Sequence, residues 1–200
     1  MTVAAAGSAL ALRLPLQMTR GPRARRPPVS ALLTMRLILG VDPVMTGAIA
    51  AIDLDDFGAL VDVIDMPIAG GEVAVPVLRE LTNQWAPHVY AVAIERVHSM
   101  PGQGVSSSFK FGQSYGTVRG FFGASFQVIH AQPSVWKGHF TLNGKDKDVA
   151  RARAIERWPG MAHMLARKKD IGRADAALIG LWSAETMPSA AAPVLTLHIP

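Results

Sequence analysis

The sequence predicts one α/β domain in which a mixed five-stranded sheet is flanked by helices, and three observations predict it. Strand-like runs at 37–41, 48–52 and 60–64 follow one another closely, as in an antiparallel meander. A continuous apolar run at 89–94 is typical of a strand that is buried on both faces. The chain has 200 residues, of which 50% are hydrophobic, so it can bury one core of ordinary size.

The elements are expected in the order β-β-β-α-β-α-β-α-α. A turn that contains Pro43 and Gly47 joins the first two strands into a hairpin. Apolar residues at 72–86 recur at close to a helical period, and Pro87 ends this expected helix. After a glycine- and serine-rich loop at 99–107, we expect a helix to about Phe122, a strand at 126–130, and helices at about 146–157 and 174–186.

Composition excludes several classes of protein. The absence of cysteine excludes a disulfide framework, a thiolate zinc site and a cysteine nucleophile, and it fits a reducing compartment. Charged residues and prolines interrupt every apolar run before the ~18 residues that a membrane helix needs. We therefore expect a soluble, cytoplasmic protein that has no membrane partner.

The termini differ in composition from the rest of the chain. Residues 1–34 contain five arginines and no acidic residue, and we interpret them as a disordered basic extension. An arginine-rich transit peptide to an organelle, or a translation start at Met18 or Met35, are the alternatives. We expect the folded domain over 35–187 and a tail at 188–200.

Charge is unevenly distributed within the domain. Residues 36–95 carry two basic and nine acidic side chains, whereas residues 96–173 carry thirteen basic and four acidic ones. An acidic half joined to a basic half suits a metal-dependent enzyme that acts on nucleic acid. Chance also produces such a split in some soluble domains.

Two acidic residues stand directly at the ends of apolar strands. Asp42 follows the run at 37–41, and Glu95 follows the run at 89–94. If these strands are parallel neighbours, their ends lie ~5 Å apart. Two carboxylates that close repel each other unless a proton or a cation lies between them. Mg²⁺ or Mn²⁺ suits such a place because it takes oxygen ligands and keeps waters for a substrate phosphate.

Further acidic candidates lie near the last helix. Asp175 falls in its first turn, among alanines and leucine that face the core. It is a candidate third ligand, or it compensates the charge of the helix N-terminus. Asp170, five residues earlier, could complete the set or be exposed.

Four segments carry a resemblance to a known family. The segment ILGVDPVMTGAIA at 38–50 resembles the opening hairpin of RuvC-type Holliday-junction resolvases, which belong to the RNase H-like superfamily. AIERV at 93–97 resembles their second acidic strand, FGQSYG at 111–116 the helix that follows it, and GRADA at 172–176 their final acidic helix. The likeness covers about 35–187 and implies an RNase H-like fold.

The resemblance implies a crossover junction endodeoxyribonuclease of DNA recombination and repair, which cuts four-way junctions as a homodimer. It implies Asp42, Glu95 and Asp175 as catalytic metal ligands, with Asp170 at the position of a fourth, where relatives carry Asp or His. Two Mg²⁺ or Mn²⁺ ions ~4 Å apart would activate water for in-line attack on a phosphodiester. Val44 departs from the family, which often has glycine at this position.

Several basic residues are candidate DNA contacts. Lys147 matches a family position close to the scissile phosphate and is therefore also a catalytic candidate. Lys145 and Lys147 lie at a turn that opens a helix, a place that suits phosphate, although the neighbouring acids could make it an ordinary solvated helix start. The other candidates, whose alternative is a solvated surface, are Lys137, Lys168, Lys169 and Arg173.

The loop at 97–104 directly follows a candidate metal ligand. Resolvases of this type use that region near the centre of the junction, so Met100 is a candidate wedge, or the loop is a plain connection. The histidines share no spacing typical of zinc, and we assign none of them as a ligand.

Other functions remain possible from the sequence. The same fold could act on other branched DNA or on structured RNA. The segment GVDPVMTG at 40–47 also resembles the phosphate-binding hairpin of actin-like and sugar-kinase ATPases. The chain is short for such a phosphotransferase, which needs two related domains. A binding module without activity would lack an acidic ligand, and every expected position is filled.

Overall fold

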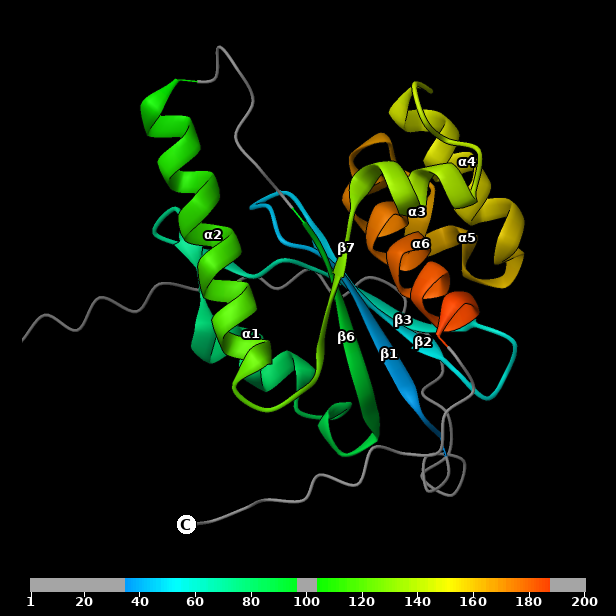
Figure 1. The fold of residues 1–200 in the computed structure, drawn as a ribbon, viewed down its shortest axis with the longest axis horizontal. Coiled ribbons are helices and arrows are strands. Elements are labelled where there is room, and N and C mark those ends of the chain that lie inside the picture. The colour runs from blue at the N-terminus through cyan, green and yellow to red at the C-terminus, as the bar shows by residue number, and fades with distance from the viewer. Residues whose placement is uncertain (1–34, 97–103, 188–200) are drawn as a thin grey trace, which may run out of the picture.

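A five-stranded mixed sheet forms the centre of the computed structural model, which describes residues 35–96 and 104–187 (Figure 1). The order across the sheet is β3-β2-β1-β6-β7. The strands are β1 (Leu37–Asp42), β2 (Ala48–Asp53), β3 (Ala59–Asp65), β6 (Val89–Glu95) and β7 (Val128–Ala131). The first three are antiparallel, whereas β6 runs parallel to β1 and β7 runs parallel to β6. The predicted mixed five-stranded sheet is therefore confirmed.

Helices cover both faces of this sheet, as Figure 1 shows. One face is covered by α1 (Val75–Thr82) and α2 (Val105–Gly123). The other carries α3 (Pro133–His139), α4 (Lys147–Arg157), α5 (Ala162–Leu165) and α6 (Ile171–Thr186). Short pieces complete the fold: the hairpin β4 (Ile68–Ala69) and β5 (Glu72–Val73), and the 3₁₀ turns η2 (Ala86–His88), η3 (Pro159–Met161) and η4 (Lys168–Asp170).

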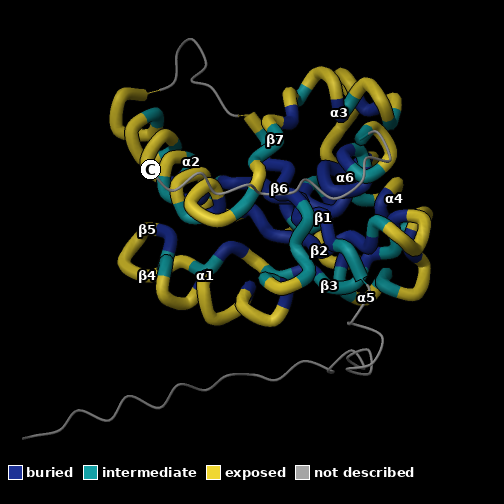
Figure 2. The backbone as a smooth tube through the Cα atoms, turned by 60° about the horizontal axis from the view of Figure 1, so that its bottom comes forward, coloured by how far each residue is buried: buried dark blue, intermediate teal, exposed yellow. Residues whose placement is uncertain are grey.

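Each face of the sheet has its own hydrophobic core. Because side chains alternate along a strand, Leu37, Leu39 and Val41 of β1 face α1 and α2, whereas Ile38 packs with α6. Figure 2 shows the strands buried between helices whose outer sides are exposed. The central strands β1 and β2 are buried at every residue, which explains their continuous apolar sequence.

Glycines let α6 lie directly against β1 and β2. A Cβ atom built on Gly40 would stand 2.1 Å from the backbone oxygen of Ala176, and one on Gly180 would stand 2.7 Å from Ile52 Cγ1. About two turns before Gly180, a Cβ on Gly172 would stand 2.5 Å from the backbone oxygen of Thr46. Gly40, Gly172 and Gly180 thus cannot be replaced by a residue with a side chain unless α6 moves. The N-terminus of α6 is held against the β1–β2 turn.

The structure differs from the predicted elements in several places, among them α5 (Ala162–Leu165), the strand β4 and the start of α6 at Ile171. The helix expected at 72–86 divides into strand β5 and the shorter α1, which begins with Pro76 in its first turn. Helix α3 was not expected. The extension at 1–34, the tail at 188–200 and Met100 lie outside the described residues. No helix in the described ranges has the length and apolar character needed to cross a bilayer.

Candidate active site

The two strand-end carboxylates predicted from the sequence lie on neighbouring strands. Asp42 is the last residue of β1 and Glu95 the last residue of β6. These strands are parallel, and Val41 pairs with Ile94, so Asp42 and Glu95 leave the sheet at the same end. Asp42 is buried, with 7% of its surface exposed. The parallel pairing of β1 with β6 thus places two acids in one buried corner.

Helix α6 brings Asp175 to the same corner. The helix begins at Ile171. Gly172 packs on the backbone of Thr46 and Gly47, and this contact holds the start of the helix beside the turn that follows Asp42. One turn into the helix, Asp175 is close enough for its charge to act on Asp42, and Glu95 in turn acts on Asp175. Three carboxylates from β1, β6 and α6 therefore form one electrostatic group, which we call the acidic triad (Asp42, Glu95 and Asp175).

The surroundings of Asp42 and Asp175 disfavour the ionised form of both carboxyl groups. Burial raises the pKa of Asp42 to about 8, and repulsion from Glu95 and Asp175 contributes to the rise. Burial likewise raises the pKa of Asp175 to about 6, although the charges of Lys137 and Lys147 oppose this rise. Two carboxyl groups that resist ionisation side by side are typical of a functional site.

Helix α3 supplies two groups to Glu95. The indole N–H of Trp136 donates a hydrogen bond to Glu95 Oε1 at 3.1 Å, and Lys137 Nζ lies 4.0 Å from the same oxygen. Lys137 also stands over the Trp136 ring, 5.1 Å from its centroid. Trp136 was not predicted as a site residue, because from sequence a tryptophan after a short strand cannot be distinguished from an ordinary core residue.

The predicted lysine turn is ordered by its own side chains. Asp146 caps α4 by accepting a hydrogen bond from the backbone N–H of Asp148 at 2.8 Å. Asn143 donates to the backbone oxygen of Ser134 at 3.0 Å, which ties the turn to α3. Lys145 and Lys147 are exposed, and the charge of Lys147 reaches Asp175. The structure thus brings Lys147 and Lys137 to the acidic triad.

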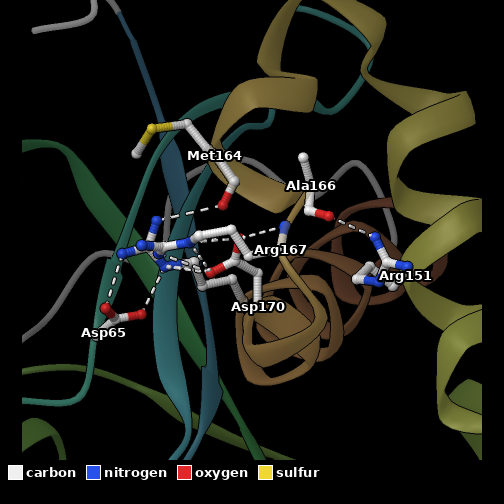
Figure 3. Close-up of polar contacts among 7 residues, drawn as sticks. Asp65, Arg151, Met164, Ala166, Arg167 and Asp170 are labelled. Carbon is white, nitrogen blue, oxygen red and sulfur yellow. Dashed lines mark hydrogen bonds and ion pairs between the residues drawn. The ribbon is translucent and has the colours of Figure 1, made fainter. Parts of the chain in front are cut away.

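Asp170 does not join the acidic triad. At the end of η4 it is 1% exposed, and it accepts hydrogen bonds from the Arg167 backbone N–H at 2.9 Å and from Arg167 Nη2 at 2.7 Å (Figure 3). Burial alone would raise the pKa of Asp170, but the hydrogen bonds from Arg167 and the charges of Arg167 and Arg173 outweigh burial and lower it. As placed, this carboxylate is engaged by Arg167 and Arg173 and not by the acidic triad.

Arg173 is also engaged in hydrogen bonds and ion pairs within the chain. Its Nη2 donates to Asp65 Oδ2 at 2.8 Å, its Nη1 donates to the Met164 backbone oxygen at 3.2 Å, and only 15% of its side chain is exposed. Figure 3 shows Asp65 of β3 on one side of this network and Asp170 on the other. The structure therefore does not present Arg173 as an open DNA contact, whereas its predicted partners Lys168 and Lys169 are exposed.

A serine of α2 holds the turn that follows Asp42. Ser114 is buried and its hydroxyl donates to the backbone oxygen of Pro43 at 2.6 Å. The backbone N–H of Val44 lies 3.5 Å from Asp42 Oδ1, and a Cβ on Gly47 would stand 2.2 Å from the Asp42 backbone oxygen. Gly47 was predicted as part of this turn, whereas Ser114 was predicted only as part of a helix, because its sequence carries no local signal of its distant partner.

Comparison with known proteins finds sequence similarity over part of the chain and a likeness of fold over most of it. No family model matches the chain. A stretch of 88 residues, 42% of the chain, is 36% identical to the chloroplastic Holliday junction resolvase MOC1 of Chlamydomonas reinhardtii, and the match spans only about a tenth of that protein's length. A structure of Thermus thermophilus RuvC matches with 21% identity and a TM-score of 0.50, over 74% of this chain and 93% of that one. The described chain has the RuvC fold. A T. thermophilus RuvC structure in complex with a Holliday junction substrate aligns with 18% identity and a TM-score of 0.49, over 74% of this chain and 92% of that one.

The likeness of fold confirms the predicted RNase H-like architecture. In this chain the RuvC fold brings together the ends of β1 and β6 and the second turn of α6, which are the places where the sequence has Asp42, Glu95 and Asp175. The prediction that Asp175 lies in the first turn is wrong, because the helix begins at Ile171 rather than at 174. The resemblance stated from four sequence segments thus holds for the arrangement of the elements that carry them.

The donor chemistry of the acidic triad fits a hard divalent cation. Carboxylate oxygens are the ligands that Mg²⁺ and Mn²⁺ prefer, and a cation among them would relieve the repulsion that raises the pKa of Asp42. In the side-chain conformations of residues 35–96 and 104–187, no three His, Asp or Glu side chains are arranged closely enough to hold a metal ion. The acidic triad therefore fits a divalent cation in the chemistry and charge of its ligands, and binding would require its side chains to move closer together.

Proposed function

We propose that this chain is a metal-dependent, structure-selective endonuclease that resolves four-way DNA junctions by phosphodiester hydrolysis as a homodimer. The observation that carries the proposal is the acidic triad, in which burial and mutual repulsion hold the pKa of Asp42 at about 8. The RuvC fold and the 36% identity over 88 residues with a protein named a Holliday junction resolvase support it.

The acidic triad would hold the catalytic ions. Asp42, Glu95 and Asp175 are the proposed ligands of two Mg²⁺ or Mn²⁺ ions, and Asp170 becomes a fourth only if Arg167 releases it. Bound ions would supply Lewis-acid stabilisation of the phosphoryl oxygens and a water of lowered pKa. Hydrolysis adds that water to phosphorus and breaks the bond to the 3′ oxygen, which leaves as a hydroxyl.

Basic side chains beside the acidic triad would bind the DNA backbone. Lys147 and Lys137 lie near enough to oppose the pKa rise of Asp175, so each can neutralise charge on a phosphate bound there. Lys145, Lys168 and Lys169 are exposed and can extend this contact along a strand.

Helix α2 is the proposed surface for a second copy of the chain. Gly112, Gly116 and Gly120 recur every four residues, and a Cβ built on any of them meets no atom within 4 Å. This open stripe lets another helix approach closely. Two copies related by a two-fold axis would present two active sites to symmetrically placed strands. Sedimentation of the junction-bound chain as a monomer only would contradict this part of the proposal.

The named relative also bears on location. It is described as chloroplastic, which supports an organellar address in residues 1–34 as the alternative to the expected cytoplasmic location.

Asp42→Asn tests the proposed function. Purified chain is incubated with Mg²⁺ or Mn²⁺ and with matched four-way, three-way, flap and linear DNA, and the products are compared. We expect the unsubstituted chain to cut the four-way junction in preference to the others. Asp42→Asn should abolish cutting while junction binding in Ca²⁺ or EDTA persists. Unchanged cutting by Asp42→Asn would remove the proposed site, and preferential cutting of flaps would reassign the substrate.

A further inference from the structure

Trp136 connects the hydrophobic core to the acidic triad. Its side chain is 0% exposed and packs in the core between the sheet and α6. An indole N–H enclosed in a core needs an acceptor, and here the acceptor is Glu95 Oε1 at 3.1 Å. Because the ring is locked by packing, the direction of its N–H is fixed by the fold.

A fixed donor restrains the movement of the Glu95 side chain. Its side chain has three rotatable bonds and is 14% exposed, and repulsion from Asp42 and Asp175 favours conformations that carry its carboxylate away from them. The Trp136 N–H binds one oxygen of this carboxylate and so restrains the Glu95 side chain to the conformation seen here. Lys137, from the same helix, lies 4.0 Å from that oxygen and is itself held over the Trp136 ring. One buried ring thus contacts both an acid and a base of the site.

We propose that Trp136 is a positioning residue that holds the Glu95 carboxylate in the acidic triad and so prepares it to bind a divalent cation. The inference rests on the proposed function. Hydrogen-bond donors behind metal-ligating carboxylates orient the ligand and tune its affinity, and their loss typically weakens metal binding 10–100-fold.

Trp136→Phe tests the role, because it keeps most of the ring and removes the N–H. In the full-length chain we expect Mn²⁺ affinity without DNA, measured by calorimetry, to fall by about tenfold. We expect kcat on a four-way junction to fall comparably, while KM stays within about twofold, because Trp136 contacts no DNA.

Trp158→Phe is the matched control. Trp158 is also buried, and its indole N–H donates to the backbone oxygen of Gly58 at 2.9 Å, far from the acidic triad. Trp158→Phe therefore removes the same kind of buried bond and should lower the thermal midpoint without changing Mn²⁺ affinity. Equal losses of Mn²⁺ affinity in both variants would reduce the role of Trp136 to general stability and overturn the proposal.

A double-substitution cycle tests whether Trp136 acts through Glu95. In a Glu95→Gln background, Trp136→Phe should cause little further loss of Mn²⁺ affinity, because the charge-assisted bond is already gone. Full additivity of the two losses would contradict the proposal.

The indole resonances provide a readout even if Trp136→Phe fails to fold. The chain has four tryptophans, so their indole N–H signals are few enough to assign. Glu95→Gln and Mg²⁺ addition should each shift the Trp136 signal and leave that of Trp158 in place; an unmoved Trp136 signal overturns the proposal. If Asp42→Asn leaves Mn²⁺ uptake intact, the proposed function itself fails. If Asp42→Asn abolishes uptake and Trp136→Phe retains it, only the positioning role is lost.

Discussion

Among single residues, Asp42 makes a contribution to stability that falls as pH rises. Its carboxyl group binds its proton more tightly in the folded chain, with a pKa of about 8, than in the unfolded chain, where a pKa near 3.8 applies. Between these values the folded state binds more protons than the unfolded state, so stability falls as pH rises through this range. Without metal, the chain should therefore be more stable at pH 5 than at pH 8.5.

Asp42→Asn should remove this dependence. In EDTA at pH 8.5 we expect the variant to be more stable than the unsubstituted chain, by on the order of 2 kcal/mol, and the gain should nearly vanish at pH 4. Urea unfolding at both pH values measures it. Asp53→Asn is the control, because buried Asp53 accepts bonds from the N–H groups of Asp55 and Asp56 at 2.8 and 3.2 Å. A gain of similar size in Asp53→Asn would show that the effect does not come from the acidic triad.

Asp170 makes the opposite contribution. The net effect of its surroundings is to lower its pKa, so it stabilises the fold above about pH 4, and this contribution is lost as pH falls through its folded-state pKa. Asp170→Asn should cost about 1–3 kcal/mol at pH 7, because Arg167 and Arg173 lose a buried charged acceptor. Calorimetry should find its Mn²⁺ affinity unchanged. A large loss of Mn²⁺ affinity would instead restore Asp170 as the fourth ligand.

At the scale of elements, the contact of α6 with β1 positions the third carboxylate. Gly40→Ala would put a methyl group 2.1 Å from the Ala176 backbone oxygen, so the helix must move or the fold must open. We expect a loss of about 3 kcal/mol or more in the free energy of unfolding, with weaker Mn²⁺ binding in the molecules that fold. Thermal unfolding and calorimetry measure the two effects.

Gly112→Ala is the matched control for this contact. It places the same methyl group on the open side of α2, and the better helix propensity of alanine should raise monomer stability by up to about 1 kcal/mol. Equal destabilisation by both substitutions would show that close packing on α6 is not the cause.

Strand elements followed from local pattern, whereas the short helices did not. The alternating and continuous apolar runs predicted β1, β2, β3 and β6 closely, because a buried strand requires apolar residues in its own sequence. Helix α3 has seven residues and includes Gly138, so its sequence alone favours it weakly. Burial of Trp136 against α6 stabilises it, and that contact joins residues distant in the chain.

In the candidate site too, residues marked by a local sequence pattern could be predicted, and residues placed by distant contacts could not. Asp42 and Glu95 could be predicted because the end of an apolar strand marks its own position. Asp170 could not be placed, because its engagement depends on Arg167 and Arg173, and loop sequence does not fix which acid an arginine binds. Ser114 and Trp136 contact the site through partners 71 and 41 residues away, a distance over which no local pattern operates.

At the scale of the whole molecule, the proposed dimer surface and the proposed DNA contacts lie on different faces of the sheet. Helix α2 has the open glycine stripe on one face, and the other face carries α3, α4 and α6 with Lys137, Lys147 and Asp175. The acidic triad lies where the two halves meet, at the ends of β1 and β6. A second copy on α2 would therefore leave the basic side of each chain available to DNA.

This division predicts that charge on α4 acts on DNA only near the acidic triad. Lys147→Ala should lower the cutting rate and reduce the slope of log affinity against log salt by about 1, since one phosphate contact is lost. Arg153→Ala, on the same helix, removes an exposed cation that pairs with Glu156 at 3.0 Å, and it should change neither quantity. Junction binding in Ca²⁺ across a salt series measures the slopes. Identical slopes for Lys147→Ala and the unsubstituted chain would mean that this lysine meets no phosphate, and equal changes in both variants would mean that the whole helix attracts DNA without a defined contact.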